Sequence, residues 1–153
     1  MRVYIKMDNI DKKILNIINK EFPVEERPYK KIARTLGITE EEVIRRVSVL
    51  KQKGIIRRIG GIIDPKAIGW YSILCAADIA PERIEEFARV VNSFVEVTHN
   101  YVRSGSPNCW FTIIAPSKTR ASEIISEIKD RLSINIVELH ARRIFKIDVG
   151  FNL

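Results

Sequence analysis

The sequence predicts an α+β protein made of a winged helix-turn-helix domain over residues 1–65 and a ferredoxin-like βαββαβ domain over residues 66–153. Three segments with helical spacing of apolar residues come first, and strand-like and helical segments then alternate. The charge supports the same division. Residues 1–60 hold 15 Lys and Arg against 8 Asp and Glu, which is the whole net charge of +7. A basic first domain indicates a polyanionic partner, either nucleic acid or a small molecule rich in carboxylates.

The first two helices are predicted from apolar spacing and from the residues that end them. One helix, capped by Asp8 or Asn9, is expected to end near Phe22-Pro23, and its apolar stripe consists of Ile10, Ile14, Leu15, Ile17 and Ile18. A polar loop then leads to a short helix over roughly residues 29–36. Together these segments form the first part of a helix-turn-helix.

The third helix has a start signal and a stop signal. Thr39 and, three residues later, Glu42 predict a capping box in which each side chain bonds the other's backbone amide. The helix is expected to run to about Lys53, and Gly54 ends it as a left-handed cap. The residues expected to point inward are Val43, Ile44, Val47 and Leu50.

Residues 55–65 are interpreted as a small hairpin, the wing of the domain. In a strand, the neighbours Arg57 and Arg58 would point to opposite faces. One would reach solvent or a DNA groove, and the other would face the second domain or remain a solvated charge.

The start of the third helix argues against DNA binding. In a DNA reader this part enters the major groove, yet here it is Glu40-Glu41-Glu42. Three carboxylates beside phosphates would lower affinity, whereas they stabilise the positive end of the helix dipole. Arg45, Arg46, Lys51 and Lys53 remain as possible contacts to a DNA backbone, so DNA binding is possible but less favoured.

The second domain is predicted to have the order βαββαβ. Its elements are a strand over 71–78, a helix over 80–93, strands over 94–103 and 107–115, a helix over 118–132 and a strand region over 134–149. Two helices on one face of such a sheet leave the other face open. Small domains of this kind usually pair through sheets or edges in a dimer.

The strand over 94–103 carries the most distinctive polar residues of the chain. Alternation places Val97, His99, Tyr101 and Arg103 on one face, which is expected to be the open one, and Thr98, Asn100 and Val102 on the other. The indole of Trp110 on the next strand can lie beside them. A base, a phenol, a cation and a flat aromatic surface indicate a ligand-binding wall. The alternative is that these residues are dimer-interface or surface residues, and His140 is interpreted as a surface residue.

The apolar segments and the cysteines indicate where in the cell the protein works. No apolar run approaches the roughly 20 residues that span a membrane, and the N-terminus lacks an apolar signal segment, so a cytoplasmic protein is expected. Cys75 and Cys109 lie in apolar surroundings without ligand-like spacing. They are predicted to be buried free thiols rather than a disulfide or a metal site.

Several short motifs resemble one branch of a known family. They are Phe22-Pro23, Arg27-Pro28-Tyr29, the wing sequence of residues 54–60, His99-Asn100-Tyr101-Val102-Arg103, Asn108-Cys109-Trp110-Phe111 and Phe145-Lys146-Ile147. On these motifs the chain from about Met7 onward resembles the Lrp/AsnC family. Within that family it is more similar to the siroheme decarboxylase branch of alternative haem biosynthesis than to the amino-acid-responsive regulators.

The resemblance implies a carboxy-lyase that removes CO2 from two acetate side chains of siroheme to give didecarboxysiroheme. It implies His99, Tyr101 and Arg103 as catalytic residues, with no cofactor beyond the iron tetrapyrrole substrate and no separate metal site. His99 would serve as general acid, and an axial contact to the substrate iron is its competing role. The residues expected to bind substrate are Arg57, Arg58, Asn100, Asn108 and Trp110.

One departure from the family pattern concerns the stretch after Arg103. The family tends to carry a second His and then a Tyr there, where this chain has Gly105 and Pro107. Either a catalytic group is missing, or a partner subunit supplies it, so the expected assembly is a homodimer or a heterodimer with a paralogous subunit.

Two other functions are consistent with the sequence. The first is an Lrp/AsnC-type transcriptional regulator that senses haem, a haem precursor or another small molecule. The second is a haem-handling subunit that binds its ligand without catalysis. The acidic start of the third helix separates the regulator from the enzyme, because the enzyme needs the helix-turn-helix only as a scaffold.

Overall fold

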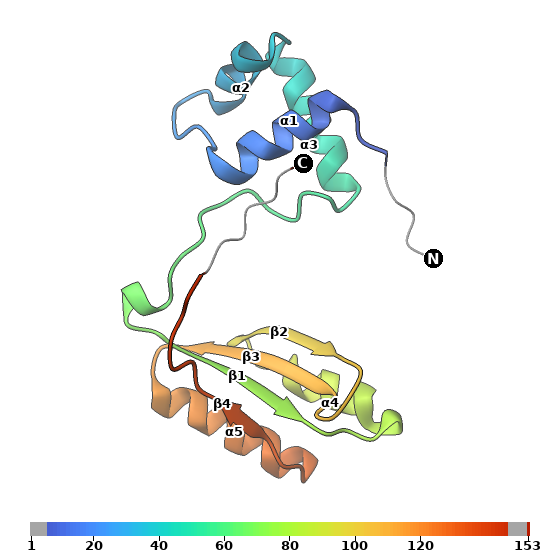
Figure 1. Cartoon of the computed structure of the whole chain (residues 1–153), viewed down its shortest axis with the longest axis vertical. Helices are drawn as coiled ribbons and strands as arrows, with labels where there is room; N and C mark the ends of the chain where they lie inside the picture. The colour runs from blue at the N-terminus through green and yellow to red at the C-terminus, as the bar shows by residue number, and fades with distance from the viewer. Residues whose placement is uncertain (1–5, 147–152) are drawn as a thin grey trace. The chain divides into compact units, whose positions relative to one another are not determined.

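The computed structural model describes residues 6–146 and 153, which form two compact units. Of these residues, 6–61, 146 and 153 belong to a helix-turn-helix unit, and 62–145 belong to a sheet unit (Figure 1). No helix in the described part of the chain is long and apolar enough to cross a membrane. The cellular location therefore stays a prediction.

The helix-turn-helix unit consists of α1 (Asn9–Lys20), α2 (Pro28–Leu36) and α3 (Glu40–Gln52), as the apolar spacing predicts. Asp8 is the cap of α1, because its carboxylate accepts a hydrogen bond from the Asp11 amide at 2.8 Å while Asp11 reaches back to the Asp8 amide. The helices pack around a core whose fully buried members are Ile14, Ile32 and Val43. This core is what holds the three short helices together.

Two details of α3 correct the sequence interpretation. Thr39 Oγ1 accepts from the Glu42 amide at 3.2 Å, but the Glu42 carboxylate binds two arginines instead of completing the predicted capping box. Ile44 was expected to point inward and is 44% exposed. The buried positions are Val43, Val47 and Leu50, spaced by four and three residues, and Ile44 lies about 100° around the helix from Val43.

The predicted wing is wrong within the described residues, because residues 55–65 contain no strand. Ile62 and Ile63 are 74% and 69% exposed, so they bury little of the apolar surface that would hold a hairpin together. The central Gly60 and Gly61 offer no side chains for cross-strand contacts and lose much conformational freedom on ordering. The opposite-face argument for the neighbouring arginines therefore does not apply.

The sheet unit has the predicted βαββαβ order. Its strands are β1 (Tyr71–Ala77), β2 (Val97–Val102), β3 (Cys109–Ala115) and β4 (Val137–Leu139), arranged antiparallel as β2-β3-β1-β4. Short 3-10 helices occupy Lys66–Ile68 and Pro81–Arg83. The predicted last strand is much shorter than expected, and its residues 147–149 lie outside the described part.

The helices α4 (Ile84–Val91) and α5 (Lys118–Leu132) cover one face of the sheet (Figure 1). Phe87 of α4 meets Phe111 of β3 edge-on at 5.9 Å between ring centres, and both are buried. Cys75 and Cys109 lie in this core as free thiols, as predicted. Burial raises the pKa of both thiols, that of Cys75 to about 12, so both remain protonated near neutral pH.

Candidate functional site

The register of β2 against β3 decides which residues face away from the helices. His99 pairs with Thr112 and Tyr101 with Trp110, whereas Phe111 between them is buried in the helix-covered core. Directly paired residues point to the same face of a sheet. His99, Tyr101 and Trp110 therefore lie on the open face, as the alternation predicts.

A β-bulge interrupts β2 just before His99. Val97 pairs with Ile113 and His99 with Thr112, so β2 advances two residues where β3 advances one, and Thr98 is the extra residue. The prediction that Val97 shares a face with His99 is wrong. Val97 packs against the helix-covered core instead, because the extra residue shifts the alternation by one.

Arg103 stacks against two aromatic rings at the end of β2. Its guanidinium carbon lies 4.8 Å from the centre of the Tyr101 ring and 5.4 Å from that of Trp110. Its Nη2 donates to the Tyr101 hydroxyl at 3.2 Å. The indole is fixed in turn, because Trp110 Nε1 donates to the Pro107 carbonyl at 2.8 Å. The three side chains form a flat aromatic and cationic wall.

No carboxylate among the described residues pairs with Arg103. Arg103 is exposed, and its contacts to Tyr101 and Trp110 do not neutralise its charge. A guanidinium in this state is suited to bind a carboxylate through two parallel hydrogen bonds. The wall can therefore receive a flat anion.

His99 stands on the same face about 7 Å along the strand from Tyr101, at the usual spacing of alternate residues. Its Nδ1 lies 3.0 Å from Thr98 Oγ1, and that oxygen lies 3.5 Å from the Thr112 carbonyl oxygen. The side chain is exposed. An imidazole with one nitrogen engaged and the ring open to solvent can exchange a proton with a bound molecule.

The two asparagines expected at the site have other partners. Asn100 pairs with the buried Phe111, so it faces the helices, and its Nδ2 donates to Asn92 Oδ1 at 3.0 Å. The Asn108 amide accepts from the Ile79 amide at 2.9 Å and donates to the Ile79 carbonyl at 2.8 Å. Both side chains therefore form hydrogen bonds within the fold. Their substrate contacts stay a prediction.

Arg57 and Arg58 are exposed and belong to the helix-turn-helix unit, whereas His99 and Arg103 belong to the sheet unit. The structure does not bring the two groups together within one unit. The contribution of both arginines to substrate binding therefore stays a prediction.

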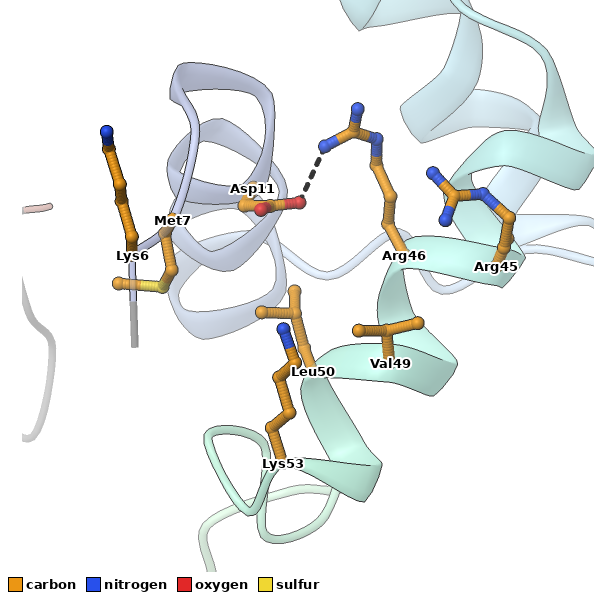
Figure 2. Close-up of a pocket in the computed structure, with 8 residues that line it drawn as sticks. All are labelled: Lys6, Met7, Asp11, Arg45, Arg46, Val49, Leu50 and Lys53. Carbon is orange, nitrogen blue, oxygen red and sulfur yellow. Dashed lines mark hydrogen bonds and ion pairs between the residues drawn. The ribbon is translucent and has the colours of Figure 1, made fainter. Parts of the chain in front are cut away.

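The helix-turn-helix unit has a small hollow of about 90 Å³ between α1 and α3 (Figure 2). Arg46 forms one wall of it. Its Nη1 donates to Asp8 and Asp11, and its Nε to Glu42, each at 2.7 Å. Glu42 also accepts two bonds from Arg45 at 2.7 Å. The residues lining the hollow are Lys6, Met7, Asp11, Arg45, Arg46, Val49, Leu50 and Lys53.

These ion pairs neutralise most of the charged side chains of α3. Hydrogen bonds from Arg45, and then from Arg46, lower the pKa of Glu42 from 4.5 to about 2. Glu40 at the start of the helix pairs with Arg27, the residue that precedes α2. The acidic groups thus connect α3 to its neighbours, and the two arginines of its first half are not free to neutralise phosphates. This agrees with a helix-turn-helix that serves as a scaffold.

The sequence interpretation missed two contacts. Thr98 was placed on the face opposite His99, because simple alternation contains no signal for the bulge. His140 was interpreted as a surface residue; it is exposed, but its Nδ1 lies 2.9 Å from the Tyr71 hydroxyl, which joins the residue after β4 to the start of β1. Only the pairing of strands that are distant in sequence reveals either contact.

Family models match both parts of the chain. Residues 11–57 match a model described as the siroheme decarboxylase NirDL-like HTH domain, and residues 67–146 match the AsnC-like ligand binding domain. The siroheme decarboxylase alpha subunit of Nitratidesulfovibrio vulgaris is 42% identical over 96% of this chain and 84% of its own length. The similarity therefore extends across both units.

Solved structures agree with these matches. The crystal structure of the siroheme decarboxylase NirDL is 31% identical with a TM-score of 0.69, over 95% of this chain and 48% of that chain. A co-complex of NirDL with an iron-uroporphyrin III analogue is 30% identical with a TM-score of 0.67, over 86% of this chain and 44% of that chain. On the family models and on an identity of 42% across nearly its whole length, this chain belongs to the siroheme decarboxylase family.

Proposed function

We propose that this chain is a siroheme decarboxylase subunit that removes CO2 from two acetate side chains of siroheme and yields didecarboxysiroheme. The observation that carries the proposal is the open sheet face, which holds His99 together with Tyr101, Trp110 and an Arg103 that no carboxylate of the described residues neutralises. Its support comes from the relative named as a siroheme decarboxylase subunit and from the NirDL complex with an iron-porphyrin analogue.

The residues of this face fit the chemistry of such a substrate. Siroheme is a flat iron tetrapyrrole with eight carboxylates, so it needs an aromatic surface and unpaired cations. Trp110 and Tyr101 offer the surface, and Arg103 offers a bidentate partner for one carboxylate. A carboxylate held in one orientation and partly removed from water loses CO2 more readily.

The proposed reaction replaces a carboxylate by a proton. The bond between the side-chain CH2 and the carboxylate breaks, CO2 leaves, and the electron pair stays on the substrate, whose conjugated ring delocalises it. A proton then joins the carbon and completes a methyl group, and His99 is its proposed donor. Since the exchange involves no net oxidation or reduction, we propose that no cofactor is needed beyond the iron tetrapyrrole itself.

The assembly is proposed from the departure after Arg103. Gly105 and Pro107 occupy positions where the family tends to carry a His and a Tyr, and Gly105 has a φ of 101° in an exposed loop. This chain matches only 48% of the NirDL chain, and its relative at 42% identity is named a siroheme decarboxylase alpha subunit. We propose a heterodimer in which a paralogous subunit supplies the missing groups; a homodimer is the alternative.

The test is an anaerobic incubation of the protein with siroheme, followed by mass spectrometry for the loss of CO2. It is run with this chain alone and with any paralogue encoded beside it. Product in either case supports the enzyme, and product only with the paralogue supports the heterodimer. If neither incubation yields product and the chain binds DNA of a specific sequence, the protein is a regulator and the proposal is wrong.

A further inference from the structure

The bulge in β2 places a threonine hydroxyl beside the imidazole that the proposed function uses. Thr98 is the extra residue of the bulge, and in a regular strand it would point to the face opposite His99. Here its Oγ1 lies 3.0 Å from His99 Nδ1 and 3.5 Å from the Thr112 carbonyl oxygen on β3. Bulges of this kind often redirect a side chain next to an active site.

The proton count of this contact defines which nitrogen of the imidazole carries hydrogen. A threonine hydroxyl has one proton to donate and lone pairs to accept with. The Thr112 carbonyl, 3.5 Å away, can only accept, and with the hydroxyl proton directed to it a lone pair of Oγ1 faces Nδ1. The bond to His99 then requires a hydrogen on Nδ1. In the neutral ring Nε2 is consequently unprotonated.

We propose that Thr98 is a positioning residue that holds His99 in the Nδ1–H tautomer, so that Nε2 is the nitrogen presented to the substrate. This inference rests on the proposed function. When the ring is protonated, Nε2–H supplies the proton to the carbon that has lost CO2, and the ring returns to the tautomer that Thr98 stabilises. The threonine thereby keeps the ring in one orientation through each proton transfer.

The first experiment measures the tautomer directly, without substrate. The full chain is labelled with ¹⁵N-histidine, and a long-range ¹H–¹⁵N spectrum assigns the protonated nitrogen of each ring. His140 is the other histidine of the chain and serves as an internal reference. The variants are Thr98→Val, which keeps the shape without the hydroxyl, and Thr98→Ser, which keeps the hydroxyl.

We expect His99 to carry its proton on Nδ1 in the wild type and in Thr98→Ser. In Thr98→Val the Nε2–H form should rise several-fold while the His140 signals stay in place. An unchanged His99 tautomer in Thr98→Val, with the rest of the spectrum native, would overturn the inference. So would a wild-type ring protonated on Nε2.

The second experiment measures turnover of the complete enzyme. Thr98→Val should lower kcat by about 10- to 100-fold, with KM changed much less, as is typical when the orienting partner of a working histidine is removed. Thr98→Ser should restore kcat to within a few-fold. A shifted tautomer with undiminished kcat overturns the catalytic part of the inference. A wild-type enzyme without activity refutes the proposed function instead, and the spectrum still decides the contact between Thr98 and His99.

Discussion

Arg46 of the helix-turn-helix unit and Arg103 of the sheet unit carry the same charge in opposite surroundings. Arg46 donates hydrogen bonds to three carboxylates at 2.7 Å, and its side chain is only 16% exposed. Arg103 stacks on Tyr101 and Trp110, and no carboxylate of the described residues reaches it. One guanidinium is neutralised within the fold, and the other has no carboxylate partner among the described residues.

This difference is the reason that we propose the site in the sheet unit. The charge census places the whole excess of positive charge in the first 60 residues and so points to the helix-turn-helix unit. The structure shows that the cations of the first half of α3 are paired with their own carboxylates. A net charge describes a domain, whereas binding of an anion depends on cations that lack a partner.

The largest expected effect is the loss of turnover in His99→Ala. Removing a general acid costs about 100- to 10,000-fold in rate, so kcat should fall at least 100-fold with the fold intact. The measurement is didecarboxysiroheme formation by mass spectrometry. His140→Ala is the matched control, because His140 contacts Tyr71 away from the open face, and its rate should change by about twofold or less. Normal turnover in a folded His99→Ala protein would remove His99 from the mechanism.

The next effect sharpens the comparison of the two arginines. Arg103→Met should weaken siroheme binding by about 10- to 100-fold, which is the usual value of a hydrogen bond between charged groups. The measurement is an absorbance titration with siroheme. Arg46→Met is the control and should leave the affinity within about threefold, since its charge is already neutralised. Equal affinities of wild type and Arg103→Met would exclude Arg103 as a carboxylate partner.

The thermal stability of the protein should depend more on Arg46 than on Arg103, which is the reverse of the order expected for siroheme affinity. Arg46→Met leaves Asp8, Asp11 and Glu42 without their shared partner, so the melting temperature of the helix-turn-helix unit should fall by about 5 °C. Circular dichroism of the full chain measures it. Arg45→Met removes a partner of a single carboxylate and should have a smaller effect. A larger loss in Arg45→Met than in Arg46→Met would contradict the ion-pair network.

The smallest expected effect is a pH dependence of the thermal stability of the helix-turn-helix unit. Because arginines lower the pKa of Glu42 in the folded state from 4.5 to about 2, its ionised form stabilises the fold above pH 4.5. This stabilisation disappears as the pH falls from 4.5 towards 2. The melting temperatures of wild type and Glu42→Gln should therefore differ near neutral pH and converge in this window. For the neighbouring Glu41→Gln the difference from wild type should vary less over the same range.

Much of the secondary structure could be predicted because its causes are local. Apolar residues at helical spacing predict α1, α2 and α3, and the turn at Gly37 needs the left-handed φ of 68° that glycine adopts freely. The alternation in β3 predicts that Trp110 faces away from the buried Phe111. These signals depend on residues within a few positions of one another, so the sequence alone contains them.

Two errors of prediction share a cause, which is dependence on partners that are distant in sequence. Residues 55–65 were expected to form a hairpin, but Ile62 and Ile63 are 74% and 69% exposed and so supply little buried apolar surface to hold one together. Asn108 was expected to bind the substrate, but its side-chain amide forms hydrogen bonds with the backbone of Ile79. A polar side chain has the same bonding capacity in either role, and only the fold decides which partner is nearer.

The sequence by itself determined the α+β class, the βαββαβ order, the family and the placement of His99 and Tyr101 on the open face of β2. Only the tertiary structure decided that the Thr98 hydroxyl contacts the His99 imidazole. It also decided that Arg46 is neutralised by carboxylates, whereas no carboxylate of the described residues pairs with Arg103. The physical reason is that a pattern of residues fixes which face of a strand or helix a side chain occupies. The charge and the proton position of that side chain depend on what the folded chain places within about 3 Å of it.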